Sequence, residues 1–178
     1  DASGDYYKGN FPDWETGNRS ASITVTTNVT LATGTIGLLV DGVIGATNMY
    51  FAAASNVGKF IKFDFQSAKI IVDAGWIQND PRTHGTWKWQ GSTNDSTWVD
   101  LGSSFTLGTA NNLVRQTFTA QLGSNTTAYR YYRLLGVSGN TSDAPWVYET
   151  EFKVDHGYAT DMTLISESET AATAPEKA

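Results

Sequence analysis

The chain has 178 residues and a formal net charge of −6 at pH 7. This acidic balance argues against nucleic acid or an anionic membrane as the main partner, because binding to phosphates requires clustered lysine and arginine. The sequence contains no cysteine, which excludes a disulfide framework, a thiolate zinc site and a cysteine nucleophile.

The first third of the chain predicts an extended arm followed by two strands. Residues 1–20 are polar and rich in glycine with scattered aromatics, and we expect an N-terminal arm or linker there. Strict alternation of apolar and hydroxyl residues predicts a half-buried strand over 21–31. The run 36–40 leads into the turn dipeptide Asp41-Gly42. Residues 58–65 alternate apolar and charged side chains, which predicts a second strand.

The middle of the chain continues the pattern of short strands and turns. An apolar run over 70–77 predicts a strand, and Pro81 and Gly85 end it in the polar loop 79–85. Residues 87–89 open another strand, which ends in the turn 92–96. A further strand is predicted over 113–120.

The last predicted strand pair spans Tyr129 to Val154. Two runs rich in aromatic and β-branched residues flank the loop 139–146, which carries the isolated Trp146. After residue 156 the sequence becomes rich in Ala, Thr, Pro and Glu, and we expect 157–178 to be a linker toward a following domain. The pattern as a whole predicts an all-β domain over 21–156, an antiparallel β-sandwich of the jelly-roll type.

Five short pieces carry a family resemblance in their order along the chain. They are Leu39-Val40-Asp41-Gly42, the predicted strands 60–65 and 70–77, the segment from Trp89 to Trp98, Tyr131-Tyr132-Arg133-Leu134, and Glu149-Thr150-Glu151-Phe152. Together they resemble the discoidin, or coagulation factor 5/8 type C, family, which overlaps the family 32 carbohydrate-binding modules. The resemblance implies a galactose-binding-domain-like jelly roll that is usually non-catalytic and binds sugars or other surface ligands with loops at one end.

The two polar loops supply the candidate ligand site, provided that both lie at the same end of the sandwich. A sugar is recognised by a flat aromatic face for its C–H side and by planar donors and acceptors for its hydroxyls. An arginine fork and a neutral histidine suit vicinal hydroxyls. The alternative is that Asp80-Pro81 begins an ordinary turn and Trp146 caps the core. The candidates are Asn79, Asp80, Arg82, His84, Asn140, Asp143 and Trp146.

A structural calcium ion is the second candidate. Loops between strands can surround a hard cation with carbonyls and carboxylates, and the resemblance places Asp41, Thr47 and Glu149 in that role. Taken alone, Asp41 is a turn former and Glu149 a solvent-facing strand residue. Calcium is therefore an expectation from the resemblance.

Function is interpreted as non-catalytic glycan binding. No nucleophile elbow, metalloprotease helix or phosphate loop is present, and no apolar stretch approaches the roughly 18 residues that span a bilayer. We expect a module of a larger extracellular or virion-surface protein that attaches to a host or a polysaccharide, with neighbouring domains of that protein as further partners; a homo-oligomer stays open. The alternatives are a structural domain of a phage tail fibre or capsid spike, since 161–166 is similar to such junctions, and an appended domain of an enzyme.

Overall fold

The computed structural model describes residues 12–46, 49–110 and 112–156, and the predicted linker 157–178 lies outside them. The elements, in chain order, are β1 (Asp13–Glu15), β2 (Thr24–Thr27), β3 (Leu31–Thr33), the 3-10 helix η1 (Ile36–Val40), β4 (Tyr50–Phe51), β5 (Phe60–Gln78), β6 (Thr86–Ser92), β7 (Val99–Thr106), β8 (Gln116–Thr117), the helix α1 (Thr119–Leu122), β9 (Tyr129–Ser138) and β10 (Val147–Asp155). None of the helices in these ranges is long or apolar enough to cross a membrane.

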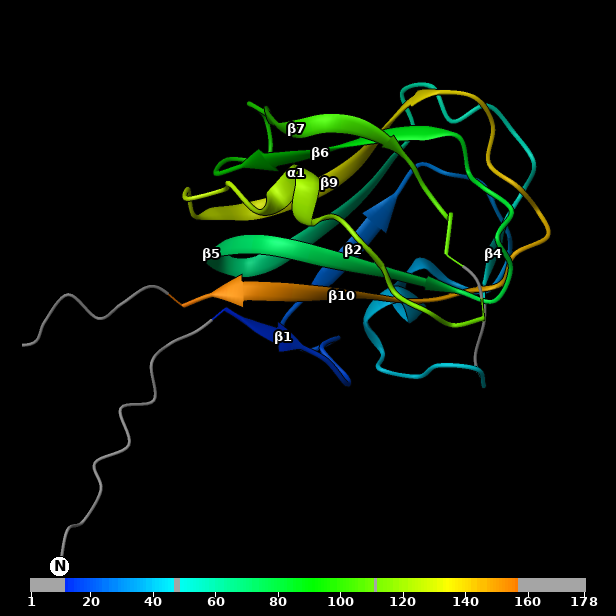
Figure 1. Ribbon diagram of the computed structural model, residues 1–178, viewed down its shortest axis with the longest axis horizontal. Coiled ribbons are helices and arrows are strands. Elements are labelled where there is room, and N and C mark those ends of the chain that lie inside the picture. Colours follow the sequence, from blue (N-terminus) through cyan, green and yellow to red (C-terminus); the bar gives the residue numbers. More distant parts are fainter. Residues whose placement is uncertain (1–11, 47–48, 111, 157–178) are drawn as a thin grey trace, which may run out of the picture.

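Most of the strands form two layers of antiparallel sheet that share β5, while β3 and β4 pair with each other separately (Figure 1). One layer has the order β2-β5-β9-β6-β7, and it uses the first part of β5. The other has the order β1-β10-β5-β8, and it uses the last part of β5. The predicted antiparallel β-sandwich is confirmed.

Strand β5 differs from the sequence prediction, which placed two separate strands over 58–65 and 70–77. The structure joins them into one strand of 19 residues that passes from one layer to the other. The crossing lies after Asp64, where the pairing with β9 shifts register and Gln66 adopts a φ of 63°. The irregularity turns the strand without ending it, as a β-bulge does.

Other differences are local. Within the predicted arm 1–20, β1 pairs with β10 at the edge of one layer. The strand expected over 113–120 is reduced to β8 and α1, because Asn112 and Leu113 adopt φ values of 54° and 63° that no regular strand allows. Strand β7, the outer strand of its layer, was not predicted.

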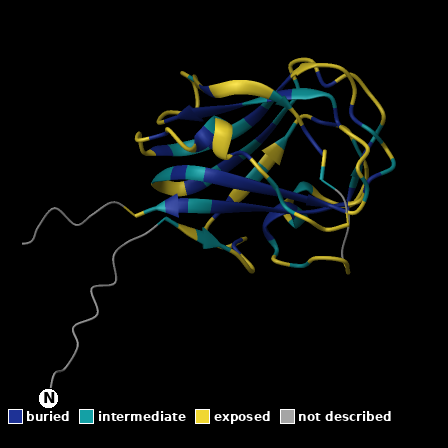
Figure 2. Cartoon of the chain, in the orientation of Figure 1, coloured by how far each residue is buried: buried dark blue, intermediate teal, exposed yellow. Residues whose placement is uncertain are grey.

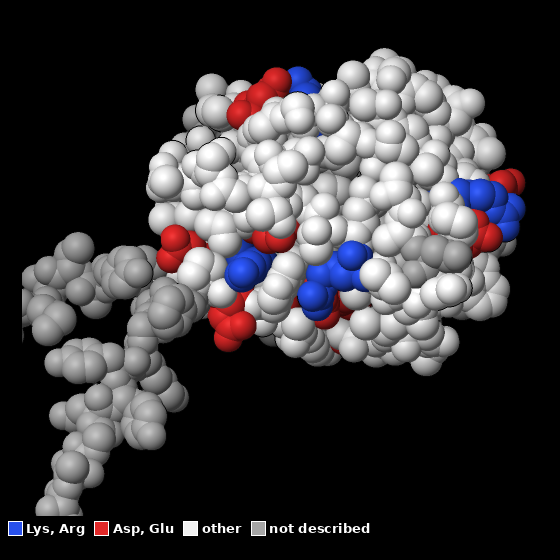
Figure 3. Space-filling view, in the orientation of Figure 1, with Lys and Arg blue, Asp and Glu red and all other residues white. Residues whose placement is uncertain are grey.

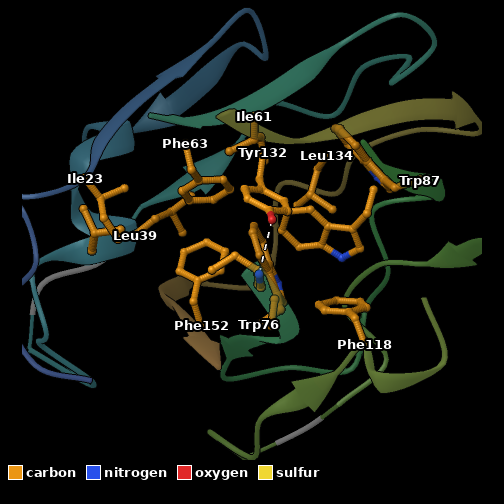
Figure 4. Packing of buried hydrophobic residues seen from close by; sticks show 14 of the residues in the cluster. Ile23, Leu39, Ile61, Phe63, Trp76, Trp87, Phe118, Tyr132, Leu134 and Phe152 are labelled. Atoms are coloured by element: carbon orange, nitrogen blue, oxygen red, sulfur yellow. Dashed lines mark hydrogen bonds between the residues drawn. The ribbon is translucent and has the colours of Figure 1, made fainter. Parts of the chain in front are cut away.

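The core lies between the layers, and its largest side chains are aromatic (Figure 4). Phe63 from one layer and Phe152 from the other meet edge to face, with ring centroids 5.0 Å apart. The Tyr132 hydroxyl lies inside this core, where it donates to the Lys69 carbonyl at 2.7 Å and accepts from the Ile71 amide at 3.2 Å. Figure 2 shows buried residues along the strands and exposed ones in the loops.

The ends of the sandwich have different roles. The described chain enters at β1 and leaves after β10, and these two lie side by side because Asp13 pairs with Val154. The long loops that precede β10 and follow β5 lie at the opposite end (Figure 1). The candidate ligand loops therefore face away from the points where the chain enters and leaves.

Candidate functional site

The two loops that the sequence singles out lie side by side. The Asn79 amide donates to the Trp146 carbonyl at 3.1 Å, and the Trp146 amide donates to Asn79 Oδ1 at 2.9 Å. The register of the sheet explains this contact, since Gln78 at the end of β5 pairs with Val147 at the start of β10. The condition placed on the candidate site, that both loops share one end, is met.

Buried Gln78 holds the backbone of the first loop from beneath. Its Nε2 donates to the carbonyls of Asp80 and Arg82, the latter at 3.1 Å, and to that of Gly108 at 3.1 Å. Asp80 Oδ1 accepts the Arg82 amide at 2.9 Å, as in an Asx turn. Hydrogen bonds from Gln78 and to Asp80 therefore fix the conformation of this loop.

The exposed face of this end combines one tryptophan with charged groups. Trp146 is 43% exposed, and the side chains of Arg82 and Asp80 are 60% and 29% exposed. Arg82 Nε and Nη2 donate to the two Asp80 oxygens, each at 2.9 Å. The hydrogen bonds from Arg82 lower the pKa of Asp80, and the charge of Asp143 adds to the rise in the pKa of Arg82 that Asp80 causes. Three charged side chains thus lie near one another in the two loops.

His84 does not lie on this face. It is fully buried, and its ring packs edge-on against Phe51 with centroids 4.9 Å apart. The Ser142 amide donates to His84 Nδ1 at 3.2 Å, so the ring proton is on Nε2, which finds no partner among the described residues. Burial lowers the pKa of His84 to about 4. The solvent-open position expected for His84 is wrong, and its ring joins the two loops from inside.

The other predicted ligand residues are divided between surface and backbone roles. Asp143 is exposed. Asn140 is also exposed, and its backbone forms a bridge with Ser55 beside the site.

A third loop also borders the site, and the sequence pattern gave no signal for it. The Leu107 carbonyl accepts the His84 amide at 2.8 Å, and the Leu113 amide donates to the Gln78 carbonyl at 3.1 Å. Leu113 and Val114 are 41% and 61% exposed. This loop extends the candidate face with apolar surface.

The expected calcium residues have other partners. Glu149 is 1% exposed, and its carboxylate accepts from Arg19 Nη2 and, at 2.8 Å, from the Gly42 amide. Asp41 Oδ1 accepts the Val43 amide at 2.9 Å. Thr47 lies outside the described residues. In the part of the chain that the structure describes, no three His, Cys, Asp or Glu residues gather as a metal site, and the solvent-facing position considered for Glu149 is wrong.

No protein-family model and no curated protein matches this sequence. Solved structures do match. The family 32 carbohydrate-binding module of C. perfringens NanJ, in complex with galactose, superposes with a TM-score of 0.56 at 10% identity over 77% of this chain and 97% of that one. The corresponding module of AlyQ, in complex with 4,5-unsaturated mannuronic acid, gives 0.53 at 19% identity over 72% and 92%.

A third match is a coagulation factor 5/8 type C domain from Bacteroides fragilis. Its TM-score is 0.55 at 14% identity, over 81% of this chain and 96% of that one. At these identities the matches show the fold. The galactose-binding-domain-like β-sandwich predicted from the sequence is confirmed.

Proposed function

We propose that this domain is a non-catalytic carbohydrate-binding module whose ligand contacts Trp146 and the loop 79–85. The observation that carries the proposal is an exposed tryptophan whose backbone is hydrogen-bonded to Asn79, in the loop that also carries the Arg82–Asp80 pair. The fold supports it, since the matching modules of NanJ and AlyQ are described in complex with sugars.

The free groups of the site fit a sugar. Trp146 offers an apolar ring face, of the kind that covers the C–H side of a pyranose. Two of the five N–H groups of Arg82 bind Asp80, so the others remain for hydroxyl oxygens. Asn79 uses its Oδ1 on the Trp146 amide, which leaves its amide nitrogen as a further donor. Because the loop backbone is already fixed, little ordering entropy is lost on binding.

The charges at the site favour an uncharged sugar. Asp80 neutralises Arg82 through two parallel hydrogen bonds, and the exposed Asp143 adds a further negative charge next to them. An anionic uronate would meet net negative charge here. Figure 3 shows that charged residues on this view of the molecule occur in small mixed clusters, separated by broad uncharged surface.

A glycan array of neutral and uronic-acid sugars, followed by calorimetry, tests the proposal. Trp146→Ala and Arg82→Ala should each weaken binding at least about tenfold, the loss of roughly 1.4 kcal/mol, without lowering the melting temperature. The matched controls are Trp98→Ala, a half-buried tryptophan stacked on Arg133, and Arg130→Ala, whose two-bond pair with Asp64 copies the geometry of Arg82 and Asp80. Both controls should leave affinity unchanged.

Two results would contradict the proposal. If no glycan binds, the chain is better interpreted as a structural domain of a larger assembly. If the controls weaken binding and Trp146→Ala does not, the ligand lies on the sheet face. Catalysis is tested separately. A hydrolase assay on the bound polysaccharide should give no product.

The wider setting follows from the same proposal. An acidic, cysteine-free chain with only 17% charged residues suits an extracellular or virion-surface protein that uses this domain for attachment. A phage setting is suggested by the segment 161–166 alone, which is similar to junctions in phage tail fibres. This segment lies outside the described residues.

A further inference from the structure

Arg19 lies buried in a shell of oxygen atoms. Its Nε donates to the Gly17 carbonyl at 3.0 Å, and its Nη1 donates to the carbonyls of Glu15 at 3.2 Å and Thr150 at 2.9 Å. Its Nη2 donates to the carboxylate of Glu149. The Arg19 side chain is only 6% exposed. Three carbonyls and one carboxylate therefore surround a single positive charge.

Such a shell has the composition that a hard cation takes from a protein, namely backbone carbonyls and a carboxylate. The carboxylate is that of Glu149, one of the residues at which the family resemblance implies calcium. Its first oxygen binds Arg19 and its second accepts the Gly42 amide at 2.8 Å. Both oxygens are thus hydrogen-bonded within the protein, and the adjacent positive charge of Arg19 would repel a calcium ion, so the described residues do not fit calcium there.

We propose that the Arg19 guanidinium is the built-in structural cation of this region and takes the place of the calcium ion expected at Glu149. A guanidinium is always available to the chain and needs no uptake from solution. Its planar fork also fixes the directions of its oxygen partners, which a spherical ion does not.

The electrostatic surroundings are consistent with a cation at this point. Burial lowers the pKa of Arg19, and the charges of Glu149, Glu151, Glu15 and Asp41 all oppose that change. Burial likewise raises the pKa of Glu149, and Arg19 opposes the rise. Burial is the larger effect on both groups, so the pair depends on its hydrogen bonds to the surrounding carbonyls and the Gly42 amide. Removal of either partner would leave the other buried and uncompensated.

The contacts of Arg19 connect three parts of the fold. Its side chain joins the end of β1 to β10, and its amide donates to the Val40 carbonyl at the end of η1 at 2.8 Å. The loops meet closely here, because a Cβ added at Gly42 would lie 2.3 Å from the Gly17 carbonyl carbon. The guanidinium therefore links the edge strand to β10, and the backbone of the same residue links both to η1.

Thermal unfolding of the whole chain tests this proposal in two arms. In the first, the wild-type melting temperature is measured with EDTA and with millimolar calcium chloride, and we expect the same value in both. A rise of several degrees with calcium would overturn the proposal. This arm needs no variant, so it is decisive even if a substitution at Arg19 prevents folding.

In the second arm, Arg19→Met keeps much of the side-chain length and removes the charge. The melting temperature should fall by about 10 °C, as expected for one broken buried pair in a chain of this size. The control Arg130→Met removes an arginine that is 42% exposed and paired with Asp64, and it should shift the value by about 2 °C or less. Equal small shifts for both variants would also overturn the proposal. Neither arm depends on a sugar, so this inference can fail while glycan binding holds.

Discussion

Protonation of His84 should destabilise this domain in mild acid. The ring is fully buried between Phe51 and Trp76, and its Nδ1 accepts the Ser142 amide at 3.2 Å. A proton on Nδ1 would remove this acceptor and place a charge in an apolar site. Only the neutral ring is therefore compatible with the folded arrangement of the two loops.

The size of the effect follows from the two pKa values. Burial lowers the pKa of His84 from 6.5 to about 4 in the folded state, while the unfolded chain takes up the proton near 6.5. Between these values the unfolded state binds more protons, so the free energy of unfolding falls as the pH falls. The full stabilisation is present above pH 6.5, and its loss amounts to about 3 kcal/mol by the lower end of the window.

Urea unfolding followed by tryptophan fluorescence, at several pH values from neutral to mildly acidic, measures this loss. The comparison variant is His84→Phe, which keeps an aromatic ring in the pocket and cannot titrate. Other acidic groups contribute equally to both proteins, so the difference between the two pH profiles isolates His84. Wild type should lose about 2 to 3 kcal/mol more than the variant across the window.

A direct NMR titration of His84 tests whether its pKa is lowered in the folded protein. The chain has two histidines, and His156→Gln assigns the two imidazole resonances in an NMR titration. Parallel pH profiles for wild type and His84→Phe, or an observed pKa of His84 near 6.5, would show that the ring is solvated or that the loops open readily.

Two further substitutions test the packing that supports the site. Tyr132→Phe removes a buried hydroxyl from its hydrogen bonds with the backbone of β5, and urea unfolding should show a loss of about 1 to 3 kcal/mol with binding unchanged; a neutral result would mean that water replaces the hydroxyl. Gly42→Ala places a Cβ against the Gly17 backbone at a φ of 77°, and should cost about 3 kcal/mol in the same assay. Gly37→Ala, with open space around it, is the matched control, and equal losses for both would argue against a close approach at Gly42.

The sequence was sufficient for the fold class because alternation is a strong signal where one face of a strand is buried. The pattern of Ile61, Phe63 and Phe65 predicts their burial, and all three are at most 1% exposed. The length of β5 could not be predicted, since its bend at Gln66 depends on pairing with strands that come much later in the chain.

The adjacency of the two candidate loops could be predicted from the sequence, whereas the burial and partners of single residues could not. Asn79 and Trp146 meet because the register of β5 and β10 brings them together, and that register follows from strands that the pattern does reveal. The burial of His84 and the pairing of Glu149 with Arg19 depend on tertiary contacts. A histidine in a polar loop and an arginine in a glycine-rich arm carry no local signal of such contacts.

The pairing of β1 with β10 also decides how the domain would respond to a mechanical load. Asp13 and Val154 face each other where the described chain enters and leaves, so a pull on both flanks acts on adjacent ends of two antiparallel strands. Such a load separates β1 from β10 one residue pair at a time, which requires little force. Once the strands have separated as far as Glu15, the load acts on the Arg19–Glu149 pair, where several hydrogen bonds must break together. The buried Arg19–Glu149 pair would thus resist further opening of the sandwich when both flanks of the domain are pulled.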